Sequence, residues 1–187
     1  ETEQILLDVN QAAKNYDYYA ASSPLPSPDD QWLVFAEDVV GRRQYSLRFQ
    51  ELATGRDLVD RIENTTGQVV WAEDSQTLFY VEKDPDTLLG KRVRKHILGS
   101  NPDDDMVVYE EHDESFYIGI GRTTDEQYIV IQSSSTISDE IRFISSSEPN
   151  HRFKILSPRQ NGVEYSADHV NGTWFIRTNL DAENFRI

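Results

Sequence analysis

The stretch Ser27-Pro28-Asp29-Asp30-Gln31-Trp32-Leu33-Val34-Phe35 decides the fold, because its pattern recurs three more times along the chain. In each copy a short polar turn leads into an apolar run. The other copies are Ala72-Glu73-Asp74-Ser75 before Leu78-Phe79-Tyr80-Val81, Thr124-Asp125-Glu126 before Tyr128-Ile129-Val130-Ile131, and the turn residues Ala167-Asp168-His169 and Asn171-Gly172 before Trp174-Phe175-Ile176. The copies recur about every 45 to 50 residues, a period typical of the four-stranded blades of a β-propeller.

Each copy divides into short runs that predict strands. The runs are rich in Val, Ile, Phe and Tyr, which suit a half-buried pleated surface. Those after the polar turns are nearly all apolar, so we expect them to be buried between neighbouring sheets. The predicted strands are 32–37, 44–52 and 58–62 in the first copy, 69–71, 78–82, 92–98 and 106–110 in the second, and 116–120, 128–132, 140–144 and 153–156 in the third.

We therefore predict an all-β fold: part of a β-propeller with four-stranded antiparallel blades. The expected blades cover approximately 20–65, 66–113, 114–160 and, incompletely, 161–187, which is about three and a half blades. Phe185-Arg186-Ile187 falls inside the expected third strand of the fourth blade, and Ile5-Leu6-Leu7-Asp8 is interpreted as the last strand of a preceding blade. We expect a piece of a larger protein. The alternative is a small complete β-sandwich.

Composition and charge narrow the class of protein. The chain has 187 residues, of which 37% are hydrophobic, enough for a sizeable core. It has no Cys, so it has neither a disulfide nor a thiolate metal site. No apolar run approaches the ~20 residues that span a bilayer. The 18 basic and 33 acidic residues give a net charge of −15, which repels nucleic-acid phosphates and anionic membranes, so we expect neither as a partner.

Further stretches follow one another in an order that resembles one known family. They include Ile5-Leu6-Leu7-Asp8-Val9-Asn10 before Tyr16-Asp17-Tyr18-Tyr19, Phe35-Ala36-Glu37-Asp38 before Arg42-Arg43-Gln44-Tyr45, Thr77-Leu78-Phe79-Tyr80-Val81, Val108-Tyr109-Glu110-Glu111, and Glu164-Tyr165-Ser166-Ala167-Asp168-His169. In these stretches the chain resembles the propeller of the oligopeptidase B family, over nearly its whole length. Residues 133–154 match in strand pattern only.

This resemblance implies a fold and an activity for the parent protein. Members of the oligopeptidase B family belong to the prolyl oligopeptidase group of serine peptidases. The resemblance implies a propeller of seven blades, joined to a C-terminal α/β-hydrolase domain with a Ser, Asp and His triad. It also implies cytoplasmic hydrolysis of short peptides after Arg or Lys, with the propeller gating access to the active site. The hydrolase domain is expected to lie outside this chain.

No catalytic machinery is expected within the chain itself. A nucleophile elbow needs Gly-x-Ser-x-Gly, and no two glycines here have that spacing. The four His residues form no His-Glu-x-x-His motif, so we predict no metal, no cofactor and no activity for the chain alone. The acidic stretch 103–114 lacks the Gly of an EF-hand calcium loop and is interpreted as a solvated loop. The glycosylation sequons at Asn64 and Asn171 are interpreted as turns.

Arg42 and Arg43 are the candidate site residues. They lie together in a connection between predicted strands of a strongly acidic chain. Arg presents a rigid fork that pairs with carboxylates, so either residue could contact the hydrolase domain, with Glu63 a weaker candidate of the same kind. Adjacent residues on a strand point to opposite faces, so we expect one of the two arginines to make the contact. The alternatives are a local ion pair and a solvated Arg, and an exposed pair contributes only ~0.2–1 kcal/mol.

Two other function classes stay open on the sequence. One is a propeller that binds proteins or ligands and has no peptidase domain. The other, a metal-dependent lactonase, needs converging Asp, Asn or Glu ligands from several blades, which half a ring does not reveal. For the chain on its own, we expect self-association through open blade edges and faces.

Overall fold

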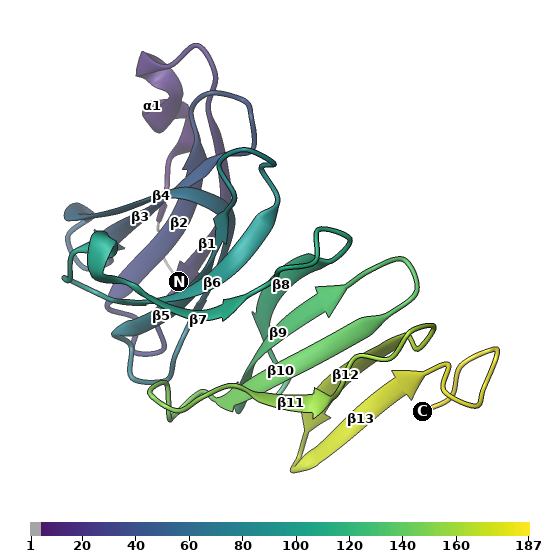
Figure 1. The fold of residues 1–187 in the computed structure, drawn as a ribbon. Coiled ribbons are helices and arrows are strands. Elements are labelled where there is room, and N and C mark those ends of the chain that lie inside the picture. The colour runs from purple at the N-terminus through teal and green to yellow at the C-terminus, as the bar shows by residue number, and fades with distance from the viewer. Residues whose placement is uncertain (1–4) are drawn as a thin grey trace.

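The strands that follow the polar turns are buried along most of their length. The computed structural model describes residues 5–187 and contains thirteen strands in three antiparallel sheets. Six of the seven residues of β2 (Trp32–Asp38) and of β5 (Thr77–Lys83) are buried. In Figure 1 the sheets follow one another as successive twisted blades. The predicted partial β-propeller of antiparallel blades is thus confirmed.

Blade one contains a strand that the sequence did not predict. It is formed by β1 (Ala20–Pro26), β2, β3 (Tyr45–Glu51) and the first part of β4 (Arg56–Trp71), each antiparallel to the next. The sequence of β1 reads Ala-Ala-Ser-Ser-Pro-Leu-Pro, which has neither an apolar run nor a clear alternation. Its pairing with β2 shifts register between Ser22 and Leu25.

Strand β4 runs from blade one into blade two without a break. Thr65 pairs with Tyr45 of β3 and also with Glu82 of β5, so the strand changes partner at this residue. Asn64 (φ 57°) and Gly67 (φ 85°) flank it in left-handed conformations that turn the backbone. The expected turn at the Asn64 sequon is therefore a bend within a strand.

Blades two, three and four contain the remaining strands. Blade two adds β5, β6 (Gly90–Ile97) and β7 (Met106–Glu110) to the second part of β4, with the short 3₁₀ helix η2 (Pro102–Asp104) before β7. Blade three consists of β8 (Tyr117–Arg122), β9 (Tyr128–Ser134), β10 (Asp139–Ser145) and β11 (Lys154–Ser157). Blade four has β12 (Tyr165–Val170) and β13 (Thr173–Thr178).

Two predictions about local structure are wrong. Residues 167–169 belong to β12 and not to a turn, because His169 is buried against the side chains of Tyr128 and Trp174. The turn lies at Asn171-Gly172, where both residues have positive φ. Arg186 then pairs with Thr178 in an isolated antiparallel bridge.

Residues 5–8 form no strand, contrary to the sequence interpretation. They lead instead into the short helix α1 (Val9–Ala12) and the 3₁₀ helix η1 (Ala13–Asn15), because the Asp8 carboxylate accepts hydrogen bonds from the backbone N–H groups of Asn10 and Gln11. Among the described residues, no helix has the length and apolar character required to cross a membrane.

Alternate side chains of β5 contact the two neighbouring blades. Leu78 and Tyr80 belong to the core between blades one and two, which also contains Phe49 and Trp71. Phe79 and Val81 belong to the core between blades two and three. The first core, between blades one and two, consists of Val34, Ala36, Leu47, Phe49, Ile62, Trp71, Leu78 and Tyr80. The second core, between blades two and three, consists of Val70, Ala72, Phe79, Val81, Val93, Ile118, Ile129, Ile131 and Ile144. The stacking of blades therefore explains why β5 is apolar on both faces.

A substitution at Gly90 tests how tightly the core between blades two and three is packed. A Cβ atom at Gly90 would lie 2.9 Å from Val81 Cγ1 and 3.2 Å from Thr66 Cγ2, whereas one at Gly121 would meet nothing within 4 Å. Gly90→Ala should lower the free energy of unfolding by about 1–3 kcal/mol through overpacking. Gly121→Ala, the matched control, should change it by less than about 0.5 kcal/mol. Urea denaturation measures both, and equal effects would contradict this account of the packing.

The chain on its own should associate through blade four. Phe175 of β13 is 51% exposed, and Ile187 is 87% exposed. The single bridge from Thr178 to Arg186 is the only pairing on the outer edge of β13 among residues 5–187. Sedimentation velocity of the isolated 187-residue chain should show a mass that rises with concentration, and Phe175→Lys should reduce that rise. A concentration-independent monomer mass would contradict the prediction.

Candidate functional site

The connections between blades all lie at one end of the molecule. Each blade has an even number of antiparallel strands, so the chain leaves a blade at the end where it came in. We call this the connection end, and it comprises residues 39–44, 64–67, 84–89, 111–116, 135–138 and 158–164. The segment that leads into β1 lies here too, since a Cβ on Gly41 would be 3.5 Å from the Tyr18 ring.

The loop that carries Arg42 and Arg43 is held by a buried carboxylate. Asp38, 1% exposed, accepts hydrogen bonds from the backbone N–H groups of Val40 (2.9 Å), Gly41 (2.9 Å) and Arg43 (2.7 Å). Burial alone would raise the pKa of Asp38, but these N–H groups outweigh it and lower the pKa. The buried Asp38 carboxylate therefore fixes the backbone of this loop, while the side chains of Arg42 and Arg43 are exposed to solvent.

Arg42 and Arg43 are both exposed and form no ion pair with any residue in the described part of the chain. They lie in a loop and not on a strand, so the expectation that they point to opposite faces of a strand does not apply. The backbone oxygen of Arg43 accepts a 2.5 Å hydrogen bond from Lys83 Nζ. Burial is the main reason why the pKa of Lys83 is lowered. The local ion pair considered for the two arginines is not observed.

Glu63 is engaged by its own blade and not by the two arginines. Its carboxylate accepts hydrogen bonds from Arg61 Nε (2.5 Å) and from Ser46 Oγ (2.6 Å). Burial works to raise the pKa of Glu63, but Ser46 and Arg61 lower it overall. The side chain is still 63% exposed, so an outside group can reach it. The structure thus does not bring the three predicted site residues together.

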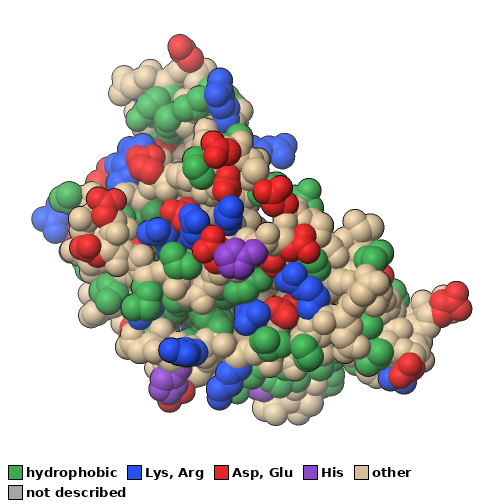
Figure 2. Space-filling view, in the orientation of Figure 1, with side chains coloured by type: hydrophobic (Ala, Val, Ile, Leu, Met, Phe, Trp, Pro, Cys, Tyr) green, Lys and Arg blue, Asp and Glu red, His purple; other side chains and the backbone are tan. Residues whose placement is uncertain are grey.

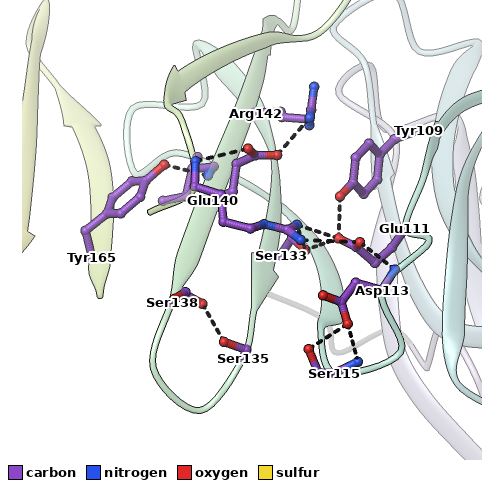
Figure 3. A network of polar contacts seen from close by, with 12 residues as sticks. Tyr109, Glu111, Asp113, Ser115, Ser133, Ser135, Ser138, Glu140, Arg142 and Tyr165 are labelled. Carbon is purple, nitrogen blue, oxygen red and sulfur yellow. Dashed lines mark hydrogen bonds and ion pairs between the residues drawn. The ribbon is translucent and has the colours of Figure 1, made fainter. Parts of the chain in front are cut away.

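Glu111 is the centre of a polar network that the sequence analysis missed. It is 8% exposed and follows β7 at the connection end. Its carboxylate accepts hydrogen bonds from Ser133 Oγ (2.5 Å), Tyr109 Oη (2.6 Å) and Arg159 Nη2 (2.6 Å), as Figure 3 shows in part. Burial opposes ionisation, but these donors lower the pKa of Glu111 to about 2.

Arg159 ties this network to the connection that leads into blade four. Its guanidinium lies 3.5 Å from the centroid of the Phe116 ring and donates to Ser133 Oγ as well as to Glu111. Its backbone N–H donates to Glu140 Oε2, and the other oxygen of Glu140 pairs with Arg142 Nη2 at 2.8 Å. The network therefore holds together two successive inter-blade connections and makes this part of the connection end rigid.

Part of the acidic stretch 103–114 is buried, contrary to the expected solvated loop. Asp105, 9% exposed, accepts a hydrogen bond from Tyr80 Oη (2.9 Å) and lies 2.8 Å from His96 Nδ1. Burial and the Asp105 charge raise the pKa of Tyr80. Asp103, Asp104, Asp113 and Glu114 are exposed. Within residues 5–187, no three or more His, Asp or Glu side chains are grouped to hold a metal ion.

Comparison with known proteins identifies the family. The model of the "Prolyl oligopeptidase, N-terminal beta-propeller domain" matches residues 1–187. The chain is 48% identical over 186 residues to dipeptidyl aminopeptidase BI of Pseudoxanthomonas mexicana, covering 99% of this chain and 26% of that protein. It is 28% identical over 188 residues to protease 2 of Moraxella lacunata, covering 100% of this chain and 27% of that protein.

Solved structures agree with these sequence relatives. Oligopeptidase B from Leishmania major superposes with a TM-score of 0.89 and 28% identity, over 95% of this chain and 25% of that one. Oligopeptidase B from Trypanosoma brucei, in a closed form with covalently bound antipain, gives 0.87 and 27% over the same shares. The chain belongs to the prolyl oligopeptidase family and forms part of the N-terminal propeller of that family. It spans about a quarter of the length of the curated relatives it matches.

The low pKa of Glu111 predicts how stability depends on pH. Its pKa is lowered from 4.5 to about 2 on folding, so the stabilisation is complete above about pH 4.5 and is lost as the pH falls towards 2. Glu111→Gln should cost about 3 kcal/mol at neutral pH, because it leaves Arg159 without its carboxylate. The variant should also lose less stability than the wild type between pH 4.5 and about 2.5.

Glu114→Gln is the matched control for this prediction. Glu114 is exposed in the same loop and is involved in no described ion pair. The free energy of unfolding of the Glu114→Gln variant, measured by urea titration at each pH, should show the same pH dependence as that of the wild type. Parallel profiles for Glu111→Gln and the wild type would refute the assignment of Glu111 as the acid-sensitive group.

Proposed function

We propose that this chain is part of the access-controlling propeller of a serine oligopeptidase that hydrolyses short peptides after Arg or Lys. The supporting observation is the likeness to oligopeptidase B from Leishmania major, with a TM-score of 0.89 and 28% identity over 95% of the chain. The catalytic Ser, Asp and His would belong to a C-terminal α/β-hydrolase domain of the same protein, and the site of action would be the cytoplasm.

The connection end supports the part of the proposal that concerns domain contact. In a closed ring of such blades the chain enters and leaves the propeller at the connection end. A domain joined to both chain termini of the propeller therefore covers the connection end. Arg42 and Arg43 project there from a loop fixed by Asp38, without an ion pair in residues 5–187. One of them pairs with a hydrolase carboxylate when the two domains close; Glu63, already shared by Arg61 and Ser46, is the weaker contact.

The charge of the chain supports the choice of substrate. A net charge of −15 attracts cationic peptides, and exposed carboxylates such as Asp86, Asp113 and Glu114 lie at the connection end. A charged surface around an opening raises the local concentration of oppositely charged ligands. Peptides with Arg or Lys are therefore favoured over acidic ones before they reach the active site.

A dipeptidyl aminopeptidase is the second candidate function. The 48% identity to dipeptidyl aminopeptidase BI favours it, since the other sequence relative described above is 28% identical. The two activities differ in what they require of the substrate. A dipeptidyl aminopeptidase needs a free α-amino group two residues before the cleaved bond, whereas an endopeptidase cleaves a substrate whose N-terminus is blocked.

The full-length protein should cleave a blocked chromogenic peptide ending in Arg, with a kcat/KM well above that for the matching peptide ending in Glu. If the protein cleaved only a chromogenic dipeptide with a free α-amino group, and not the blocked peptide, its activity would be that of a dipeptidyl aminopeptidase. Absence of hydrolysis of both would leave a binding propeller and refute the peptidase proposal. The Arg42→Ala, Arg43→Ala double variant should lower kcat/KM by about tenfold and increase the radius of gyration in small-angle scattering.

The control for the double variant is Arg56→Ala. Arg56 is 72% exposed in blade one and lies at the opposite end of the blade, 3.6 Å from Glu51. Its loss should leave both turnover and scattering unchanged. Unchanged closure and turnover in the double variant would remove Arg42 and Arg43 from the domain contact.

A further inference from the structure

A groove on the outer rim separates blade two from blade three. It has a volume of about 420 Å³ and lies between β7 and the loop that joins β10 to β11. Its apolar lining includes Met106, Val107, Pro149 and Phe153. The Phe153 ring packs edge-on against Phe79 of the core at 5.5 Å between centroids, so the floor of the groove continues the core. The groove is large enough for a ligand or a peptide segment.

The charges of this groove are opposite to those of the chain as a whole. Lys95, Arg142 and Arg152 line it, together with His151, whose ring contacts Glu148 at 3.1 Å. No Asp or Glu among residues 5–187 lines the groove, although the net charge of the chain is −15. In Figure 2 blue side chains and a purple one gather near the lower edge, where Figure 1 places this part of blade three. The groove is therefore a cationic region on an acidic protein.

Two of these cations lack a carboxylate partner within residues 5–187. Lys95 Nζ donates only to Asn150 Oδ1, at 2.9 Å, and Arg152 is exposed without an ion pair. By contrast, Arg142 pairs with Glu140 and lies over the Tyr109 ring, but its Nε atom is buried without a hydrogen-bond partner. An anionic group in the groove would meet uncompensated positive charge.

Strand β7 gives the groove an open backbone edge. It is the last strand of its seven-stranded sheet, so its outer edge pairs with no strand in the described structure. Met106 is 60% exposed and Val107 is 41% exposed beside that edge. Unpaired backbone N–H and C=O groups at a sheet edge can receive an added strand, and neighbouring pockets then select its side chains.

We propose that this groove binds an extended acidic peptide segment, which adds as a strand to β7. Its carboxylates pair with Lys95 and Arg152 on the face of the sheet that carries Met106, because Lys95 lies directly opposite Met106 in the register of β6 and β7. Period-two alternation of acidic and apolar residues then places its apolar side chains on the other face, beside Val107. A second copy of this acidic chain and a nucleic acid are both disfavoured by charge repulsion.

Fluorescence anisotropy with the full-length protein and a labelled peptide alternating Glu and Val tests the proposal. Lys95→Gln and Arg152→Gln should each weaken binding by about fivefold, and Met106→Asp by about tenfold, because it adds a carboxylate to the groove. Raising the ionic strength should weaken wild-type binding. Lys14→Gln, which removes a cation from the distant helix η1, should leave the affinity unchanged.

Three results would overturn the proposal. Equal binding of a peptide alternating Lys and Val would show that the groove does not select for acidic residues. Equal competition by inorganic polyphosphate would show a general anion surface instead of a strand site. Concentration-dependent dimerisation that Met106→Asp abolishes, without any binding of the acidic peptide, would make a second copy the occupant.

Discussion

The stacking of the blades depends on strands that bury both faces, of which β5 is the clearest example. β5 contributes Leu78 and Tyr80 to one core and Phe79 and Val81 to the next, so neither blade can be removed without exposing the other. At ~25 cal/mol per Å² of buried apolar surface, such shared layers supply most of the cohesion. The polar contacts at the ends of the blades then fix how far one blade is rotated against its neighbour.

Local patterning was sufficient for most of the architecture. A polar turn followed by an apolar run locates β2, β5, β9 and β13, and in β2, β5 and β9 burial begins within two residues of the start of the strand. It failed for β1, whose small and polar residues become a strand only by pairing with β2. It failed at residues 167–169 for a related reason: His169 is buried by contacts with the preceding blade, where it packs against Tyr128 and lies 2.7 Å from Asp125.

The site residues show where sequence reasoning reaches its limit. Arg42 and Arg43 were singled out because two adjacent cations are conspicuous in an acidic chain, and a loop position follows from neighbouring strand patterns. The pairing of Glu111 with Arg159 could not be found in this way, since the partners lie in successive inter-blade connections and meet only when two blades stack. A carboxylate directly after a strand was the one available signal, and the acidic stretch around it concealed that signal.

The unbroken course of β4 makes the seams between blades mechanically unequal. Blades one and two share one hydrogen-bonded ladder, with Thr65 paired on both sides. Within residues 5–187, blades two and three share no ladder. Their apolar core is supplemented by isolated hydrogen bonds, from the Ile120 N–H to Gln68 Oε1 and from the Glu73 N–H to the Ser146 backbone oxygen. A force that pulls the blades apart along the circumference of the propeller would thus separate blade three from blade two first, and blades one and two would move together as one rigid unit.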